Sequence, residues 1–313
     1  MLSRVADSLY WMARYLERGE HTARLVAVKL ESMVEQSRED ADLSWHRVVE
    51  ALSGEEFAPK AHDAYVITQA LAFNRFNSSS LLSSLRFARD NARQVREQLS
   101  TEVWEHLNKL YLRLQPVTTE AVWSHSPARV FREALEDFHT LEGVIYSTLS
   151  HNEGWYFIQL GRHIERAQLV IRLLELHFRQ LPGASSPKYF DWLVLLKFCT
   201  AFEPYCKAYT AAIRPEKIAE FLIFDDEFPH SVRFSVDRVV DSLSRVATAA
   251  PPARRVAVER LAGKLKAAVD FGQIEELMSG GLVPFLADIT RQCEKIHESV
   301  HLSYIAYGAE TVL

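Results

Sequence analysis

Apolar residues recur at steps of three and four along most of the chain. The longest run has apolar or small residues at Leu2, Val5, Leu9, Met12, Leu16, Gly19, Ala23, Val26, Leu30 and Met33. This spacing is typical of one buried helix face and predicts a helix over 2–33. A second run covers 157–181 and stops at Pro182-Gly183, residues that terminate helices. A third run covers 81–99.

The same period predicts shorter helices over 44–52, 61–73, 102–113, 128–149, 189–209, 216–224, 232–247, 254–270 and 283–307. Ser80, Asn152 and Ser231 stand where helix N-caps are expected. Loops are predicted at 53–59, 115–126, 181–187, 249–252 and 279–281. No run alternates apolar and polar residues for long enough to indicate a strand. Only 11 Gly and 11 Pro are available for turns, which also favours an all-α fold.

Polar residues repeat between the two halves of the chain. When Leu9–Val26 is placed on Phe157–Leu174, the motif Arg14, Glu17, Arg18 falls on Arg162, Glu165, Arg166. Two further pairs of segments, 67–85 with 218–236 and 131–146 with 289–304, match in the same order. Helical periodicity explains the matched apolar positions but not the polar ones. We therefore predict a single domain, 1–313, that is a helical bundle of two duplicated halves, about 1–150 and 151–313, around a pseudo-two-fold axis.

Composition restricts the class of protein. Hydrophobic residues make up 48% of the chain, enough for a substantial core, and the formal charge of −5 gives no basic field that would attract nucleic acid. No apolar run reaches the roughly 18 residues of a membrane span. The three cysteines include no Cys-x-x-Cys pair, and charged residues interrupt the first 18 positions. We expect a cytoplasmic protein without a secretory leader.

Each long helix carries Arg-x-x-Glu-Arg beside its buried face. Glu17 and Glu165 each follow a core residue, so they lie at the edge of that face. One interpretation is structural: the charges form local or interhelical ion pairs. The other is a paired site in which Arg clamps an anion and Glu is a ligand or base. The candidate site residues are Glu17, Arg18, Glu165 and Arg166, with Arg14, Arg162, Arg89 and Arg93.

Small residues flank these motifs. Ala13, Gly19, Gly161 and Ala167 would let another helix approach closely.

Four arginines lie in the third run, each one position after an apolar residue of the buried face. They are Arg86, Arg89, Arg93 and Arg96. They have the chemistry to hold phosphate or carboxylate, or to face Glu17 or Glu165. The competing expectation is that Asp90 and Glu97 neutralise much of their charge through ion pairs.

A metal site is a further alternative. Carboxylates and histidines follow the order of two-metal helical bundles at Glu17, Glu136, His139, Glu165, Glu294 and His297. Residues 297–301 also match the zinc-protease string His-Glu-x-x-His. No other cofactor is predicted. The sequence has no Gly-rich phosphate loop, so the chain should not bind ATP in a P-loop or Rossmann manner.

Several long stretches resemble a known family. Residues 1–18, 88–97, 151–167 and 228–232 are similar to the alpha-E domain family, all-helical bacterial proteins named for a Glu-Arg motif. The resemblance covers nearly the whole chain. Two positions depart from the family pattern. Ser78 stands where Pro is usual, and His230 stands where Arg is frequent.

The resemblance implies partners rather than a reaction. Proteins of this family are associated with a circularly permuted ATP-grasp-like protein, a transglutaminase-like protein and sometimes a proteasome-like peptidase. We therefore expect a helical component of a peptide-ligation, modification or processing system, which docks the ATP-grasp-like partner or presents peptide to it. Two alternatives stay open. The chain is an enzyme acting on a peptide or amide at Glu17 and Glu165, or its Glu-Arg pairs are purely structural.

Overall fold

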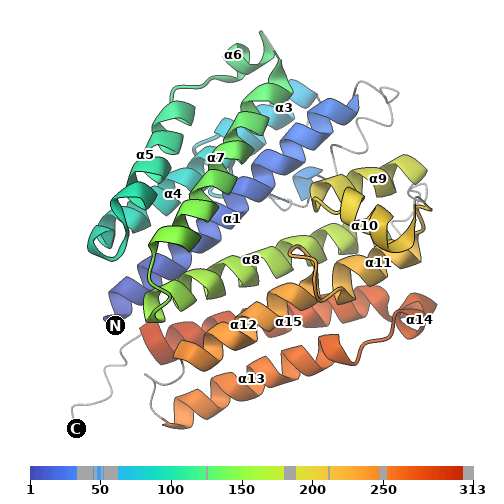
Figure 1. Cartoon of the computed structure of the whole chain (residues 1–313). Helices are drawn as coiled ribbons and strands as arrows, with labels where there is room; N and C mark the ends of the chain where they lie inside the picture. Colours follow the sequence, from blue (N-terminus) through green and yellow to red (C-terminus); the bar gives the residue numbers. More distant parts are fainter. Residues whose placement is uncertain are drawn as a thin grey trace. The chain divides into compact units, whose positions relative to one another are not determined.

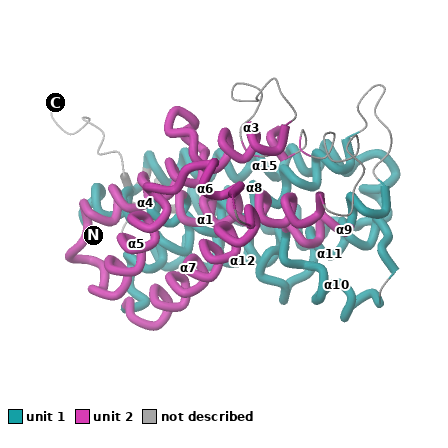
Figure 2. Tube along the Cα trace, turned by 90° about the horizontal axis from the view of Figure 1, so that it is seen from above, with its two compact units in different colours: residues 1–14, 150–192, 199–313 teal, residues 15–149, 193–198 magenta. Residues whose placement is uncertain are grey.

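The computed structural model describes residues 1–33, 45, 48–50, 52, 63–124, 126–179, 188–210, 212–246 and 252–305. Their regular elements are all helical, without a strand in the described ranges, which confirms the all-α prediction. The chain forms two compact units, coloured in Figure 2. Unit 1 comprises 1–14, 150–192 and 199–313, and unit 2 comprises 15–149 and 193–198. In the described part, no helix has the length and apolar character to cross a membrane.

Both long helices predicted from the apolar period are present. Helix α1 spans Ser3–Ser32 and α8 spans Glu153–Phe178. Helix α8 begins at Asn152, whose side chain accepts hydrogen bonds from the backbone nitrogens of Gly154 (3.0 Å) and Trp155 (3.4 Å). Unlike an amphipathic surface helix, α8 is buried on almost every side over its middle turns. Its charged residues are therefore held inside the protein.

Unit 1 is a bundle around α8. Helix α8 packs against α12 (Val232–Val246) and α15 (Leu282–Val300), and both of these pack against α13 (Pro252–Asp270), as Figure 1 shows. Helix α11 (Pro215–Phe224) packs against α8, α12 and α13 and also contacts the short α14 (Ile274–Glu276).

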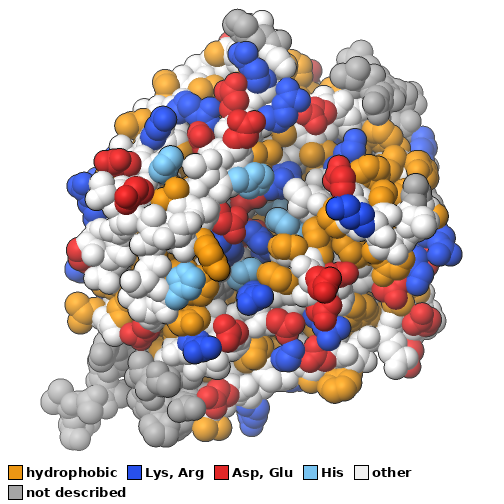
Figure 3. All heavy atoms as spheres, in the orientation of Figure 1, with side chains coloured by type: hydrophobic (Ala, Val, Ile, Leu, Met, Phe, Trp, Pro, Cys, Tyr) orange, Lys and Arg blue, Asp and Glu red, His pale blue; other side chains and the backbone are white. Residues whose placement is uncertain are grey.

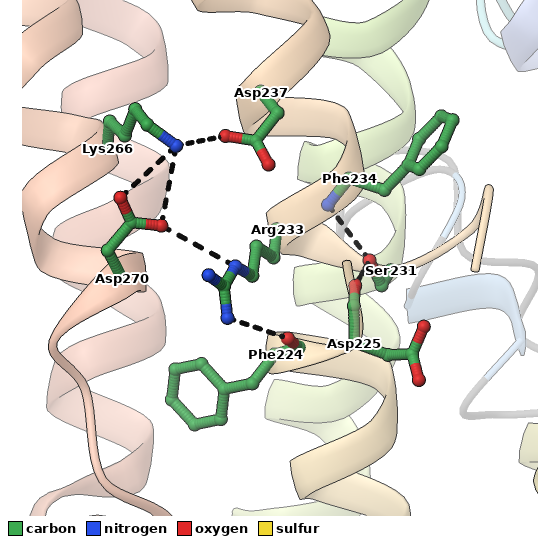
Figure 4. A network of polar contacts seen from close by, with 8 residues as sticks. All are labelled: Phe224, Asp225, Ser231, Arg233, Phe234, Asp237, Lys266 and Asp270. Atoms are coloured by element: carbon green, nitrogen blue, oxygen red, sulfur yellow. Dashed lines mark hydrogen bonds and ion pairs between the residues drawn. The ribbon is translucent and has the colours of Figure 1, made fainter. Parts of the chain in front are cut away.

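An ion network joins three of these helices (Figure 4). Lys266 on α13 pairs with Asp237 on α12 and lies 3.1 Å from Asp270 on its own helix. Arg233 on α12 lies 3.5 Å from Asp270 and donates to the carbonyl oxygen of Phe224, the last residue of α11, at 3.4 Å. These side chains are partly exposed, so the network fixes the helix ends while each pair contributes little stability.

Unit 2 contains residues 15–32 of α1 and a second group of helices. These are α3 (Ala64–Thr68), which continues into the π-helical turn η2 (Gln69–Phe73), α4 (Leu81–Gln94), α5 (Thr101–Leu114), α6 (Thr119–Trp123) and α7 (Pro127–Thr148). Helix α5 packs against both α4 and α7. The predictions over 102–113 and 128–149 are confirmed.

One predicted helix is wrong. Residues 189–209 form two helices, α9 (Tyr189–Phe198) and α10 (Phe202–Tyr209), separated at Thr200, which has a φ of 52°. Pro204 explains the break, because a proline inside a continuous helix would clash with the carbonyl four residues earlier, that of Thr200. In the first turn of α10 the proline is tolerated. Cys199 and Cys206 therefore do not share a helix.

Other boundaries also differ from prediction. Helix α4 ends at Gln94 and is followed by the 3₁₀ turn η3 (Arg96–Gln98) instead of continuing to 99. The predicted loop 115–126 contains α6, and the predicted loop 279–281 lies in the π-helical turn η5 (Leu277–Gly281). The predicted helix 283–307 is α15 followed by the π-helical turn η6 (His301–Ile305). The loops at 53–59 and 181–187 and most of the loop at 249–252 lie outside the described residues. In the predicted helix 44–52 the described residues, 45, 48–50 and 52, are helical.

Two aligned segments of the proposed repeat have the same local structure. Asn74 and Asp225 each accept a hydrogen bond from the backbone nitrogen two residues later, at 3.0 Å in both cases. Six residues further on, Ser80 and Ser231 cap α4 and α12 by accepting from the nitrogens of Ser83 (3.2 Å) and Phe234 (2.9 Å). Both N-cap predictions are confirmed. The duplication and its pseudo-two-fold axis stay predictions.

Candidate functional site

The two Glu-Arg motifs are joined by a buried ion pair in unit 1. Arg14 on α1 donates from Nε to Glu165 on α8 at 2.7 Å, and their side chains are 8% and 4% exposed. Arg14 Nη2 also donates to the side-chain oxygen of Gln168 at 3.0 Å. The pair is thus interhelical, one of the two structural arrangements considered from the sequence. Buried charges need such matched partners, since an unpaired one is very costly.

The Tyr10 side chain connects the Arg14–Glu165 ion pair to His297. Arg14 Nη1 donates to the hydroxyl of Tyr10 at 3.4 Å, and that hydroxyl lies 2.8 Å from Nδ1 of His297 on α15. Because the hydroxyl oxygen accepts from Arg14, its hydrogen is available to donate to Nδ1. With the hydroxyl as donor, neutral His297 is assigned the tautomer that carries its proton on Nε2. We call Tyr10, Arg14, Glu165, Gln168 and His297 the Arg14 cluster.

Burial and charge keep His297 neutral. Its pKa is lowered to about 4 by desolvation, then by Arg14 and His301, while Glu165 opposes the shift. Burial raises the pKa of Tyr10 to about 12, so the phenol keeps its proton. The cluster therefore presents a neutral imidazole N–H beside an ion pair of zero net charge. This chemistry suits a neutral hydrogen-bond acceptor such as a peptide carbonyl.

Close helix packing allows this arrangement. A Cβ atom on Gly161 of α8 would lie 2.3 Å from the carbonyl oxygen of Tyr10 on α1. No side chain fits there, so the prediction of a close approach at Gly161 is confirmed. Gly19 in unit 2 faces the ring of Phe138, which would lie 3.0 Å from an added Cβ.

Further ionisable side chains of unit 1 are buried on α8 and α15. Arg162 and Arg166 are buried, and Arg166 Nη1 donates to the carbonyl oxygen of Pro229 at 3.3 Å. His163 lies between them in sequence, and desolvation, followed by Arg166 and Arg162, holds its pKa well below the ordinary value. Burial raises the pKa of Cys293 to about 12, which rules out a thiolate nucleophile there.

The remaining candidate residues lie in unit 2. Glu17 is buried on α1, and the Arg18 guanidinium lies over the Tyr15 ring at 5.6 Å. Arg89 bonds Asn108 at 2.7 Å and Arg93 pairs with Asp90 at 3.6 Å, so both have their partners on α4 and α5. The hypothesis that Glu17 and Glu165 line one cavity stays a prediction.

Unit 2 also contains a polar group that joins His139, one of the metal-ligand candidates, to two residues that the sequence did not single out. Glu20 and Arg24 form an ion pair on α1, and His139 of α7 lies 3.4 Å from Glu20 and 3.2 Å from Arg24. In the proposed repeat His139 corresponds to His297, and in its own unit each contacts α1.

The six proposed metal ligands come from four helices, α1, α7, α8 and α15. In the described part of the chain, no group of three or more His, Cys, Asp or Glu side chains is arranged to hold a metal ion. Glu136 and Glu294 are exposed on their helices. In the zinc-protease string, His297 lies on α15 and His301 begins the π-helical turn η6 that follows it. Metal binding at these residues stays a prediction.

Tyr10 and Gln168 were not among the site residues predicted from the sequence, although their spacing gave a signal. Tyr10 precedes Arg14 by four residues and Gln168 follows Glu165 by three, the spacings that place helical residues on one face. The contact of Tyr10 with His297 had no local signal, because the two are 287 residues apart. It depends on the packing of α1 and α15.

Comparison with known proteins places the chain in a family. Residues 1–305 match Alpha-E, described as "a predicted alpha-helical domain with a conserved ER motif". Uncharacterized proteins of Mycobacterium bovis and Mycobacterium tuberculosis are 24% identical over 317 aligned positions, which cover 95% of this chain. The chain spans about a third of the length of these relatives, 35%. No solved structure matches. Because the family match covers nearly every residue and includes both Glu-Arg motifs, the chain belongs to the Alpha-E family.

Proposed function

We propose that this chain is the helical component of a peptide-ligating or peptide-modifying system, in which the Arg14 cluster binds a peptide group for an ATP-grasp-like partner. The observation that carries the proposal is the half-buried His297, oriented by Tyr10 and backed by the Arg14–Glu165 pair. A transglutaminase-like protein is the second expected partner.

The chemistry of the cluster supports binding of an amide rather than an anion. Glu165 neutralises Arg14, and His297 adds no charge at neutral pH. The N–H that His297 presents at Nε2 is suited to a peptide carbonyl oxygen. Gln168 and Tyr10 each accept a further hydrogen bond from Arg14, so the cluster is organised before peptide binds.

The partner is proposed from the resemblance of the Glu-Arg stretches and from what the sequence lacks. Ligation of a peptide needs activation of a carboxylate by ATP. This sequence contains no Gly-rich phosphate loop, so the nucleotide would be bound by the partner. On the face shown in Figure 3, acidic and basic side chains are interspersed, which suits a protein partner better than a polyanion.

The test is reconstitution with the ATP-grasp-like protein from the same cells. Peptide-dependent release of ADP is measured with and without this chain. We expect release to require the chain and to fall about tenfold or more with Tyr10→Phe or His297→Asn. Tyr146→Phe on α7 is the matched control, because that side chain is 65% exposed. ADP release that does not depend on the chain would rule the proposal out.

A second candidate function is catalysis by the chain itself. Half-buried His297 is favoured for this role as an acid–base group, whereas Glu165 is already engaged by Arg14. In that case the chain alone hydrolyses or transfers a peptide amide. Glu17→Gln separates the alternatives. Loss of turnover with unchanged melting would support an enzyme that uses Glu17, and a lowered melting temperature without loss of turnover would support a structural role for the motif.

A further inference from the structure

Unit 2 carries a line of arginines whose charge is mostly not neutralised. Arg86, Arg89, Arg93 and Arg96 form this line, which we call the arginine stripe. The sequence led us to expect ion pairs with Asp90 and Glu97, but only Arg93 has one, to Asp90 at 3.6 Å. Among the described residues, no carboxylate lies within 4 Å of the other three guanidinium groups. The expected neutralisation is therefore wrong for most of the stripe.

Aromatic rings on α5 hold Arg89 and Arg96 in place. Arg89 lies over Tyr111 at 5.0 Å and Trp104 at 5.7 Å and donates from Nε to Asn108 at 2.7 Å. Arg96 lies over the same Trp104 ring at 5.3 Å. The indole thus contacts two guanidinium groups. Stacking on a ring orients a guanidinium without using its outer N–H groups, which stay available for an anion.

The register of α4 and α5 places an aromatic and polar face of α5 against the stripe. Trp104, Asn108 and Tyr111 are spaced four and three residues apart, so they share one face of α5. Helix α5 packs against α4, which carries most of the stripe (Figure 1). Arg86 lies over the Phe87 ring at 4.8 Å, and the Arg93 side chain is 65% exposed. The surface is therefore basic, aromatic and open to solvent.

We propose that the arginine stripe is a docking surface for an acidic peptide segment of a partner protein. On α4 the arginines Arg86, Arg89 and Arg93 recur about every turn, roughly 5 Å along the helix, and Arg96 follows in the turn η3. This spacing suits carboxylates at helical spacing on another chain. A nucleic acid fits less well. Asp90 and Glu97 flank the stripe, and the whole chain carries a charge of −5.

This inference concerns unit 2 alone and does not rest on the function proposed for the Arg14 cluster. The experiment uses the full chain and a fluorescein-labelled helical peptide with Glu at every third and fourth position. A peptide with Gln at those positions is the control ligand. Fluorescence anisotropy should show binding of the Glu peptide that weakens as salt increases, and no comparable binding of the Gln peptide.

Matched variants locate the contact. Arg86→Gln combined with Arg96→Gln should weaken binding about tenfold. Neither side chain makes a hydrogen bond in the described structure, so thermal unfolding should hardly change. Lys109→Gln combined with Lys207→Gln removes the same charge from exposed positions off the stripe and should weaken binding less than about twofold. Trp104→Leu keeps every charge but should weaken binding by releasing Arg89 and Arg96.

The proposal is overturned if the Gln peptide binds as well as the Glu peptide. Equal losses in the arginine and lysine variants would also overturn it, because binding would then follow net charge alone. A single-stranded oligonucleotide that binds more tightly than the Glu peptide, and loses binding in the arginine variant, would assign the surface to nucleic acid instead. Arg86→Lys combined with Arg96→Lys keeps the charge and should bind more tightly than the Gln variant.

Discussion

Arg14 on α1 and Glu165 on α8 form a buried ion pair with an Nε–oxygen distance of 2.7 Å, and this contact links the two Glu-Arg motifs of the chain. Each residue comes from a different motif. The pair anchors Tyr10 and, through it, His297.

Breaking this pair should strongly destabilise the protein. Glu165→Gln leaves the buried Arg14 without its counter-charge and should reduce the free energy of unfolding by about 3–5 kcal/mol. Arg14→Met combined with Glu165→Leu should recover much of that loss, since neither charge is then buried alone. Urea unfolding measures the free energy of unfolding of the single and of the double variant. Arg132→Met, which removes an exposed pair with Glu31, is the control and should cost less than about 1 kcal/mol.

The close approach of α1 and α8 at Gly161 gives a second test of stability. Gly161→Ala places a Cβ 2.3 Å from a backbone oxygen, so α1 and α8 must separate. We expect a loss of about 3 kcal/mol or more in unfolding free energy. Gly143→Ala on α7 is the control, because nothing lies within 4 Å of an added Cβ there. It should be neutral or stabilising by up to about 1 kcal/mol. Similar effects of both variants would contradict the contact.

Acid should weaken unit 1 through His297. Its pKa of about 4 in the folded protein lies below the ordinary value of 6.5. The unfolded chain then binds more protons between these values. The contribution to stability is full above about pH 6.5 and declines as pH falls towards 4. NMR titration of the His297 ring should show a midpoint near 4.

Tyr10→Phe tests the origin of that pKa. The phenol donates to the neutral imidazole, so its removal should raise the midpoint of His297. A midpoint near 6.5 in the unaltered protein would show that the ring is not held as described.

The two serine caps should contribute equally if the repeated segments are equivalent. Ser80→Ala and Ser231→Ala each remove an acceptor for a helix N-terminal nitrogen and should each cost about 1 kcal/mol. Ser147→Ala, at an exposed position on α7, is the control and should change stability by less than about 0.5 kcal/mol. Thermal unfolding gives all three values. A large effect at only one cap would weaken the case for duplication.

The sequence predicted the long helices well because their cores need apolar residues at a constant spacing. The prediction over 189–209 is wrong although Pro204 is a visible signal, because the apolar period continues across the point where the proline ends the helix. The Glu-Arg motifs identified Arg14 and Glu165 as candidate site residues. Their pairing could not be predicted, since it depends on where α1 and α8 cross, and the same holds for the contact of His297 with Tyr10.

The division of α1 between the units has a practical consequence for splitting the gene. A fragment of residues 150–313 lacks the first 14 residues that belong to its unit, and with them Tyr10 and Arg14. Glu165 would then be left without its counter-ion. Expressed separately, the fragments 1–149 and 150–313 should each be insoluble or rapidly degraded. Co-expression should restore soluble protein from both fragments. The chain is thus a natural candidate for a two-piece complementation reporter.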